Sequence, residues 1–471
     1  MKVLAIDIGT SSVRSALFDS RARSVRASKT ARSYRLRHEV DHAAELDPAL
    51  LLRATKDCLR ETRRCLTKRQ SLAIAASGFW HSLLGLDRTG NPLTPIYTWA
   101  DARCVDDAFF LRQRMNERAI QQRTGCMLRA SFWPAKLIWL QRTRPRLFRR
   151  AARWVSPPEW IFEQLFGVRS CSHSMASGTG LYHLGRHDWD EEMLDMVGLT
   201  PSQLNPLQDC VAHPDGTIFT PIGDGAAGNL GSGASRPGVI AINVGTSAAV
   251  RVVTPPGTPL PFGLFRFAID EQRSLLGGAI SNAGSLRAWC LRELCLPNER
   301  REIEKLLRQK WKETSRLTIL PFLVSERAPT WPDDLSGTII GLSQATTAAD
   351  LLAAMVAASF HRLAEILREL ETAAGRANRI IVSGGVVQSM ASLQVLSDSL
   401  GRKLEVCAEQ EASLRGAAVH ALEQLGLEVP APKIKRRLHN RPVQTAQKRK
   451  EAARQRELEQ LLGNQLLKRG H

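Results

Sequence analysis

The chain has 471 residues, of which 43% are hydrophobic and 24% are charged, and its formal net charge is +19. This length suits two large domains, and the composition is that of a soluble globular protein, not of a fibrous or disordered one. The longest apolar run, near residues 351–360, is too short to span a bilayer, and no cleavage site follows the apolar N-terminus. Nine scattered cysteines without a C-x-x-C pair exclude a typical zinc site or disulfide framework. We therefore expect a reduced, cytoplasmic protein with no membrane partner.

The first stretch with a chemical signature follows the apolar run at residues 1–6. Residues 7–12 read Asp-Ile-Gly-Thr-Ser-Ser, and a second apolar run occupies residues 15–19. This pattern predicts a β-hairpin whose turn contains a glycine and several hydroxyl side chains. Backbone N–H groups in such a turn can approach a phosphate closely. The carboxylate of Asp7 suits a divalent cation that is bound through waters.

A predicted helix at residues 47–68, which an Asp-Pro pair begins, and a predicted buried strand at 71–77 come next. Residues 99–103 read Trp-Ala-Asp-Ala-Arg, which places three side chains on one face if the segment is extended. An aromatic plane beside hydrogen-bonding charges suits a polyhydroxylated ligand. A tryptophan packed in the core, with an Asp–Arg pair at its rim, fits this spacing equally well. Taken alone, His81 is more often a structural histidine than a ligand.

A second informative stretch places Asp224 between two glycines. It lies at the end of an apolar strand and at the start of an Ala/Gly-rich helix, within residues 221–231. The helix N-terminus favours an ionised carboxylate, which could accept a proton from an attacking hydroxyl. An aspartate that only caps the helix fits the stretch equally well.

The pattern of the first hairpin returns near the middle of the chain. The apolar run 239–242 leads into Asn-Val-Gly-Thr-Ser at 243–247, and Gly245 follows Gly9 by 236 residues. This repetition predicts a duplicated domain with two phosphate-facing turns, although each hairpin alone could be an ordinary turn. Asn243 carries no charge, so only the first turn suits the metal.

The second half contains further glycine turns. A Gly-rich turn at 277–284 precedes a helix, a long helix is predicted over 348–370, and a buried strand at 380–383 leads into two glycines and a helix at about 389–400. Paired glycines leave a flat backbone surface on which an adenine could lie, although strand–glycine–helix turns are common in α/β proteins.

The C-terminal residues differ in charge from the rest of the chain. From Ala431 to His471 there are twelve Lys/Arg and three Glu residues, so +9 of the net charge lies in this segment. A helix is predicted at 451–467. This basic tail is expected to lie on the body as a solvated helix or to contact an anionic partner, nucleic acid included, with marked salt dependence.

Taken together, five ordered motifs resemble the FGGY carbohydrate kinases over roughly residues 1–428. These motifs are residues 7–11, 77–103, 223–228, 244–247 and 383–385. The resemblance implies an α/β fold of duplicated ribonuclease H-like domains, as in the actin- and hexokinase-type ATPases, with an interdomain cleft. It implies an N-terminal domain at 1–235 with the sugar side and catalytic base, a C-terminal domain at 236–428 with the nucleotide side, and the basic helical tail at 429–471.

The resemblance also implies roles for individual residues. Asp7 would help to hold Mg²⁺, and Asp224 would be the general base that activates a sugar hydroxyl toward the γ-phosphate of ATP. Residues around the phosphates and the nucleoside would be Gly9, Thr10, Ser11, Gly245, Thr246, Gly284, Gly384, Gly385 and Ser389. Residues on the sugar side would be His81, Trp99, Asp101 and Arg103. Closure of the domains would exclude water from the reaction.

Within the family, residues such as 98–103 and 326–331 are most similar to those of gluconate kinases, which implies phosphorylation of gluconate to 6-phosphogluconate. Xylulose or another polyol is the alternative substrate, because xylulose kinases share the core motifs. Departures at 79–81 and 129–134 fall on the sugar side, where Arg129 could pair with a sugar-acid carboxylate or be a surface arginine. A rival from another class is a non-catalytic ATP-binding regulator whose tail binds nucleic acid; the intact acids argue against it. A homodimer is left open.

Overall fold

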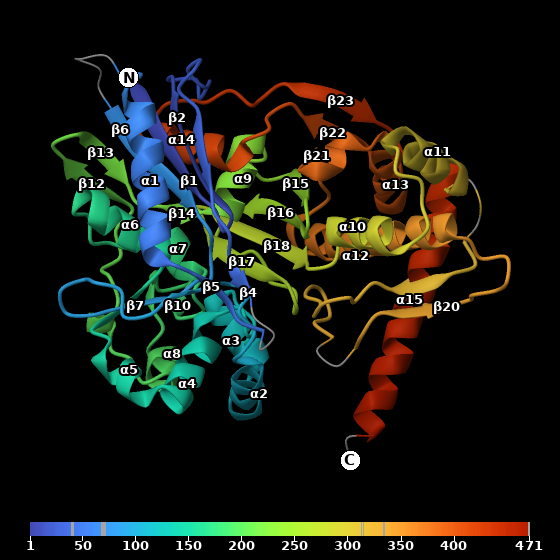
Figure 1. The fold of residues 1–471 in the computed structure, drawn as a ribbon, viewed down its shortest axis with the longest axis horizontal. Coiled ribbons are helices and arrows are strands. Elements are labelled where there is room, and N and C mark those ends of the chain that lie inside the picture. The colour runs from blue at the N-terminus through green and yellow to red at the C-terminus, as the bar shows by residue number, and fades with distance from the viewer. Residues whose placement is uncertain (39–41, 67–71, 312, 314, 333–334, 470–471) are drawn as a thin grey trace.

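The structure, a computed structural model, describes residues 1–38, 42–66, 72–311, 313, 315–332 and 335–469. These residues form two α/β lobes that lie side by side (Figure 1). Each lobe contains a seven-stranded sheet of described residues. The predicted end of the first helix, residues 67–68, and the first residue of the following strand, Ser71, lie outside the described residues.

The first sheet is built around the N-terminal hairpin. Strand β1 (Lys2–Ile8) pairs antiparallel with β2 (Ser12–Phe18) and parallel with β6 (Leu72–Gly78). Six of the seven residues of β1 are buried: Val3 and Ala5 belong to one buried cluster, and Leu4, Ile6 and Ile8 belong to another, so both faces of the strand are covered. The hairpin predicted from the sequence is confirmed. The remaining strands of this sheet are β3 (Thr30–Ser33), β12 (Cys210–His213), β13 (Gly216–Phe219) and β14 (Ile222–Gly223).

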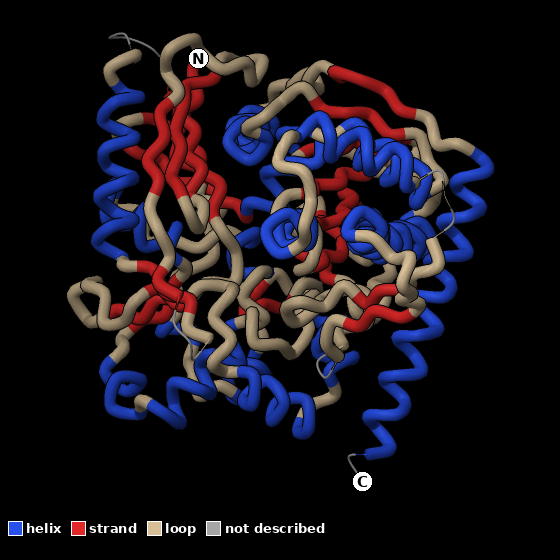
Figure 2. Tube along the Cα trace, turned by 45° about the vertical axis from the view of Figure 1, so that its right-hand side comes forward, coloured by secondary structure: helices blue, strands red, loops and turns tan. Residues whose placement is uncertain are grey.

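The second sheet repeats this arrangement. Strand β15 (Val239–Val244) pairs antiparallel with β16 (Ala248–Thr254) and parallel with β21 (Arg379–Ser383). The predicted duplication is therefore confirmed, and Figure 2 shows the two sheets in red in separate lobes. The other strands of this sheet are β17 (Phe265–Ala268), β18 (Ser274–Ile280), β22 (Leu404–Cys407) and β23 (Ile434–Leu438).

Helices cover the sheets, and several begin where the sequence predicts. Helix α1 (Pro48–Arg63) begins after Asp47, whose side chain accepts a hydrogen bond from Ala49 N. Helix α12 (Ala348–Ala374) begins with a capping box formed by Thr347 and Asp350. The other helices are α2 (Val105–Arg114), α3 (Glu117–Thr124), α4 (Trp133–Thr143), α5 (Pro145–Arg150), α6 (Pro157–Phe166), α7 (His173–Ser177), α8 (Glu191–Met196), η1 (Pro201–Gln203), α10 (Gly284–Glu293), α11 (Arg300–Lys310), η2 (Gly385–Gln388) and α13 (Met390–Leu400).

Short strands complete the description. They pair in small sheets outside the two main ones. Their bounds are β4 (Arg37–His38), β5 (Ala44–Leu46), β7 (Leu84–Leu86), β8 (Ile96–Tyr97), β9 (Arg153–Val155), β10 (Tyr182–His183), β11 (Asp188–Trp189), β19 (Thr318–Leu320) and β20 (Thr338–Ile340). Within the described ranges, no helix has the length and apolar character needed to cross a bilayer.

Two glycine-containing helices join the lobes. Helix α14 (Ala412–Gln424) comes from the C-terminal half of the chain, yet it packs on β1 and β6 of the first sheet and along α9 (Asp224–Ser232). A Cβ atom on Gly231 would lie 1.7 Å from the carbonyl oxygen of Ala412, and one on Gly416 would lie 1.7 Å from that of Ala227. The two helices are therefore in backbone contact, and the first lobe is completed by residues near the end of the chain.

The basic C-terminal segment is part of the second lobe. Strand β23 pairs with β22 at the edge of the sheet, and α15 (Pro442–Arg469) packs against α12, α13 and β19. The predicted helix is present, but the residues before it extend the sheet and do not form a separate tail. Part of its charge is neutralised in ion pairs: Arg437–Glu405, Arg441–Asp398, Lys448–Glu451 and Arg456–Glu365. The last turns of α15 extend beyond the body of the molecule (Figures 1 and 2).

The α9–α14 contact predicts a strong effect of added methyl groups. Gly231→Ala and Gly416→Ala should each lower the free energy of unfolding by about 2–4 kcal/mol, because the new Cβ would collide with backbone that cannot move aside easily. Chemical denaturation of the full chain measures this loss. Gly463→Ala in α15 is the matched control: no atom lies within 4 Å of the position that its Cβ would take, so the change should be neutral or slightly stabilising. Equal stability of all three variants would contradict the proposed constraint.

Candidate active site

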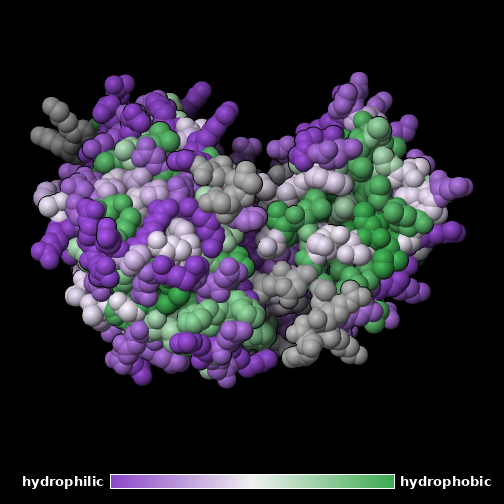
Figure 3. Space-filling view, turned by 60° about the horizontal axis from the view of Figure 1, so that its bottom comes forward, coloured by the Kyte–Doolittle hydropathy of each residue, from purple (hydrophilic) through white to green (hydrophobic). Residues whose placement is uncertain are grey.

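A cavity of about 230 Å³ is lined by residues of both lobes. Figure 3 shows the molecule from below, with a notch between the lobes and a patch of hydrophobic side chains on the right-hand lobe. The polar residues that line the cavity are Thr10, His81, Ser131, Asp224, Asn243, Ser247, Arg251 and Arg327, and its aromatic residues are Trp80, Trp99, Phe132, Phe265, Phe267 and Trp331. The predicted interdomain cleft is thus present.

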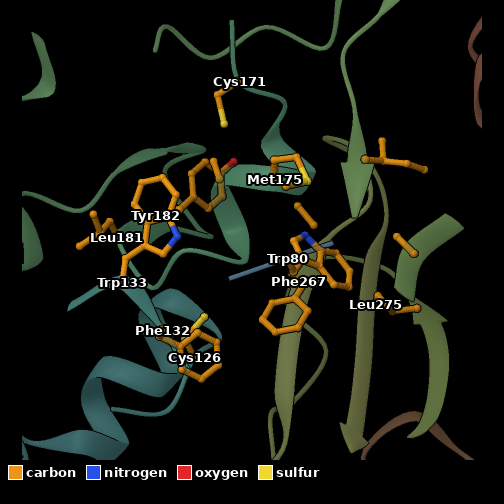
Figure 4. Close-up of a cluster of buried hydrophobic side chains, with 14 of the residues drawn as sticks. Trp80, Cys126, Phe132, Trp133, Cys171, Met175, Leu181, Tyr182, Phe267 and Leu275 are labelled. Atoms are coloured by element: carbon orange, nitrogen blue, oxygen red, sulfur yellow. The ribbon is translucent and has the colours of Figure 1, made fainter. Parts of the chain in front are cut away.

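The indole of Trp80 determines how the first residue of α9 is presented. Its Nε1 donates a hydrogen bond to Ser174 O at 2.9 Å, and its ring packs against Phe267 (Figure 4). A Cβ on Gly223 would lie 1.7 Å from the indole, and one on Gly225 would lie 2.7 Å from it. The two glycines that flank Asp224 are therefore required by the close approach of the Trp80 ring.

Asp224 is the first residue of α9 and does not cap it. The N-cap is Gly223, so the interpretation of Asp224 as an N-cap is wrong. Among the described residues, its carboxylate accepts one hydrogen bond, from Gly225 N to Oδ1 at 2.8 Å. Burial raises the pKa of Asp224 above its ordinary value, whereas the nearby Arg251 guanidinium opposes this rise. A carboxylate with a raised pKa is a stronger base that can still be ionised at neutral pH.

Two arginines line the cavity together with Asp224, and Arg251 is the one whose charge acts on this carboxylate. The Nε of Arg251 is buried and has no hydrogen-bond partner among the described residues. Arg327 donates from Nε to Ser281 Oγ and from Nη2 to Ile280 O, both at 3.1 Å, and its guanidinium lies 5.7 Å from the centre of the Trp99 ring. Burial lowers the pKa of Arg327 to about 10, so it is charged at neutral pH. The described lining therefore carries two guanidinium groups and one carboxylate.

Neither arginine was assigned a role from the sequence. Arg327 lies in a stretch used for the family resemblance, and Arg251 interrupts the buried strand β16, where a charged residue is uncommon. That signal could have identified it. Arg129, the residue suggested for a sugar-acid carboxylate, does not line the cavity; it pairs with Glu117 and lies over the Trp331 ring.

His81 lies in the cavity as a neutral ring. Its Nδ1 is 2.5 Å from Gly178 O; because a carbonyl only accepts, Nδ1 carries the proton and Nε2 is left as an acceptor. Burial lowers the pKa of His81 to about 3. The ring packs against Phe132 and Phe267, with centroid distances of 4.7 and 5.4 Å.

The side chains of Trp99, Asp101 and Arg103 do not all lie in the cavity. Residues 99–103 form turns, not a strand, so the three side chains do not share a face. Trp99 lines the cavity, but Asp101 and Arg103 do not; Arg103 donates to both oxygens of Asp101, and also to Glu45 at 2.6 Å. Asp101 is 2% exposed. The structure thus shows the Asp–Arg pair as a buried support, and direct contact with a sugar would require its rearrangement.

Asp7 lies at the end of β1, where the first glycine turn begins. Its Oδ1 accepts a hydrogen bond from Ser77 Oγ at 2.6 Å, and its Oδ2 lies 3.6 Å from Arg14 Nη1. Burial raises the pKa of Asp7 to about 6, with smaller contributions from Asp224 and Glu411 that a bound cation would offset. No cluster of three metal-ligating side chains occurs among the described residues, so a divalent ion here would use this one carboxylate together with water and phosphate oxygens, as Mg²⁺ commonly does. The residues present fit Mg²⁺.

The predicted nucleotide residues lie in two places. Thr10 lines the cavity, in the turn that Gly9 begins and Ser11 continues; the N–H of Gly9 donates to Ser12 O at 3.0 Å, as the N–H of Gly245 does to Ser247 O at 2.9 Å.

The remaining predicted glycines meet at the second turn. Gly284 N donates to Gly245 O at 3.0 Å, and the following N–H donates to Thr246 O. A Cβ on Gly284 would lie 2.3 Å from Gly245 O, and one on Gly384, which has a φ of +88°, would lie 2.5 Å from Val244 O. Gly385 follows at the start of η2. Ser389 does not have a free hydroxyl, since it caps α13 and bonds to Ser392.

Comparison with known proteins agrees with this geometry. Residues 2–219 match the N-terminal domain, and residues 240–424 the C-terminal domain, of the FGGY family of carbohydrate kinases. The chain is 29% identical to a gluconokinase of Bacillus subtilis (strain 168), over 90% of this chain and 88% of that protein. Its fold is similar to a gluconate kinase and to a ligand-bound xylulose kinase, both from Lactobacillus acidophilus, with TM-scores of 0.91 and 0.90; each is 23% identical, with 98% of both chains covered.

The burial of Asp7 predicts that replacing it with a neutral residue stabilises the folded protein, and that this gain depends on pH. Its folded pKa, about 6, exceeds its ordinary value of 3.8, so the folded state loses stability as the pH rises through this interval. Asp7→Asn should therefore raise the free energy of unfolding by about 2–3 kcal/mol above pH ~6, with little gain below pH ~4. Denaturant titrations of the metal-free protein at both pH values measure this difference.

Asp19→Asn is the matched control, because the pKa of Asp19 lies below its ordinary value: burial raises it, but the hydrogen bonds from Arg23 and Arg21 and the charge of Arg23 together outweigh that effect. This variant should be destabilised at neutral pH and unaffected at low pH. A pH-independent effect of Asp7→Asn would show that burial does not destabilise the ionised carboxylate of Asp7.

Proposed function

The chain belongs to the FGGY family of carbohydrate kinases and is an ATP-dependent sugar kinase, and from that premise we propose that it phosphorylates gluconate to 6-phosphogluconate with Asp224 as the general base. Xylulose or another neutral polyol is the alternative, since relatives named as xylulose kinases also match the chain. The choice between them depends on the charge of the cavity.

The observation that carries the proposal is the excess of one positive charge in the cavity. Within the described lining, Asp224 is one carboxylate beside two guanidinium groups, and His81 is neutral. The buried Glu326 also attracts Arg327, but it lies outside the lining and accepts hydrogen bonds from Ser281 N and Asn282 Nδ2. The lining itself therefore carries one more positive than negative charge. Buried charge without a partner is costly, and an arginine pairs best with a planar carboxylate. Gluconate supplies that carboxylate together with a chain of hydroxyls, whereas xylulose has no charge.

The geometry suggests a separate role for each residue in binding and proton transfer. Asp224 would accept the proton of the attacking hydroxyl, and Arg251 would keep it ionised until then. His81 Nε2 would accept a hydrogen bond from a second hydroxyl, and the Trp99 ring would cover the apolar face of the sugar. Arg327, held by Ser281 and Ile280, would pair with the carboxylate.

The phosphates of ATP would face the two glycine turns. Backbone N–H groups near Thr10 and Thr246 are the available donors for phosphate oxygens. Asp7 would hold Mg²⁺, which when bound supplies positive charge that offsets the charge on the phosphates. Gly284, Gly384 and Gly385 would lie around the nucleoside. The first two lack side chains because their backbone approaches that of Gly245 and Val244 closely.

The first test is ADP production from MgATP with a panel of gluconate, D-xylulose, glycerol and D-glucose. Gluconate should give the highest kcat/KM, and Asp224→Asn should lower kcat by about 10²–10⁴-fold, because proton transfer in the transition state is lost. Circular dichroism checks that the variant folds. Turnover with D-xylulose but not gluconate would reject the substrate, and near-normal turnover of Asp224→Asn would reject the base.

A second variant tests the charge argument. Arg327→Met should lower kcat/KM for gluconate by about 10²-fold, the worth of a charge-assisted carboxylate pair, and should affect a neutral poor substrate far less. Arg266→Met is the control, because Arg266 lies between Phe265 and Phe267 on β17 but does not line the cavity. An equal loss for charged and neutral substrates would assign Arg327 a structural role only.

A further inference from the structure

A second cavity, of about 380 Å³, lies in the second lobe and shares no lining residue with the active-site cavity. It is bounded by α12, by α15 and by the segment that contains β19. Alanines of α12, among them Ala354 and Ala358, line one side, and buried polar side chains of α15 line the other. Lys448 is 2% exposed and Glu451 is 6% exposed. A volume above 300 Å³ is typical of small-molecule sites.

The cavity contains a buried acceptor without a partner. Gln455 Nε2 donates to Ala358 O at 3.2 Å, so its Oε1 is the atom that accepts from His361 Nδ1, at 3.0 Å. His361 Nε2 is therefore an unprotonated acceptor, and none of the described residues lies within hydrogen-bonding distance of it. Burial lowers the pKa of His361 to about 4, which keeps the ring neutral near pH 7. His361 itself is 5% exposed.

A second acceptor lies opposite this nitrogen. Glu451 Oε2 is 3.8 Å from His361 Nε2, and it already accepts a hydrogen bond from Lys448 Nζ at 2.7 Å. Two facing acceptors at this distance cannot bond to each other, because neither carries a proton. Two neighbouring hydroxyl groups of one molecule could donate to them separately.

The charges around the cavity balance, which favours a neutral occupant. Among the described lining residues, three cationic side chains accompany three carboxylates, and Lys310 pairs with Asp350 at 2.9 Å as Lys448 does with Glu451. An anion would meet Glu451, and a cation would meet Lys448. The alanine side offers an apolar surface for the C–H face of a small molecule.

We propose that this cavity is a second binding site, for a small neutral polyhydroxylated molecule whose adjacent hydroxyls donate to His361 Nε2 and Glu451 Oε2. The assignment does not depend on the substrate of the active site. It places a sugar- or polyol-sized ligand under the C-terminal helix, in the lobe opposite the catalytic base.

The test uses the full chain labelled with ¹⁵N-histidine and titrated with xylitol as the probe. Ring nitrogen resonances report directly on the acceptor state of Nε2, and His361→Asn assigns the signal. Millimolar xylitol should shift the His361 Nε2 resonance saturably. In Ala354→Leu, whose larger side chain would fill the cavity, the shift should disappear while the protein remains folded and active.

Four results would overturn the proposed second binding site. An unmoved His361 signal would mean that the cavity holds only water, and an equal shift in wild type and Ala354→Leu would mean an indirect effect; either overturns the proposal. A shift with gluconate but not xylitol would overturn the neutral class. Should Ala354→Leu fail to fold, His361→Asn replaces it: its amide can still donate to Gln455 but lacks the Nε2 acceptor. Calorimetry should then show xylitol affinity at this site reduced about tenfold, and unchanged affinity would overturn the assignment.

Discussion

The backbone contact between α9 and α14 is the constraint on which the active site depends. Helices usually pack with side chains between them, but Gly231 and Gly416 bring these two into direct backbone contact. Helix α9 presents Asp224, and α14 returns from the C-terminal half to cover the first sheet. The position of the proposed base is therefore fixed by residues almost two hundred positions apart. The Trp80 ring adds a second constraint. It packs directly against Gly223 and Gly225, where any side chain would collide with it.

Burial of charge explains the chemistry of the cavity. The same low-dielectric surroundings raise the pKa of Asp224 and of Asp7, and lower the pKa of His81 and Arg327. The proposed base, a neutral acceptor and the proposed charged anchor thus arise from one physical cause that acts on different groups. Because the lining carries two guanidinium groups and one carboxylate, the proposed anionic substrate would supply the second negative charge.

The C-terminal helix supports the loop of the cavity wall that carries Arg327. Arg362 of α12 is fully buried and donates to Glu459 of α15, to Ala328 O and to Thr330 Oγ1. Those last two residues closely follow Arg327 in the chain. A segment that looked like a separate basic tail therefore holds the loop that carries a cavity arginine. The cost of leaving Arg362 unpaired in the interior would make this network sensitive to any loss of Glu459.

Local pattern was enough to predict much of the molecule. Both glycine hairpins, the duplication and the helix starts follow from short-range rules of strand pairing, turns and capping, and Asp7 and Asp224 stand out because a lone acid beside glycines is unusual. The Asp101–Arg103 pair was one of two interpretations that the sequence left open. Only the tertiary structure placed the pair outside the cavity lining, because an extended segment and a turn place their side chains differently. The meeting of Arg251, Arg327 and Asp224 in one cavity lining, and the docking of α14 and α15, were decided only by the tertiary structure. Such contacts join residues distant in the chain, and their energies depend on burial, which no local sequence pattern contains.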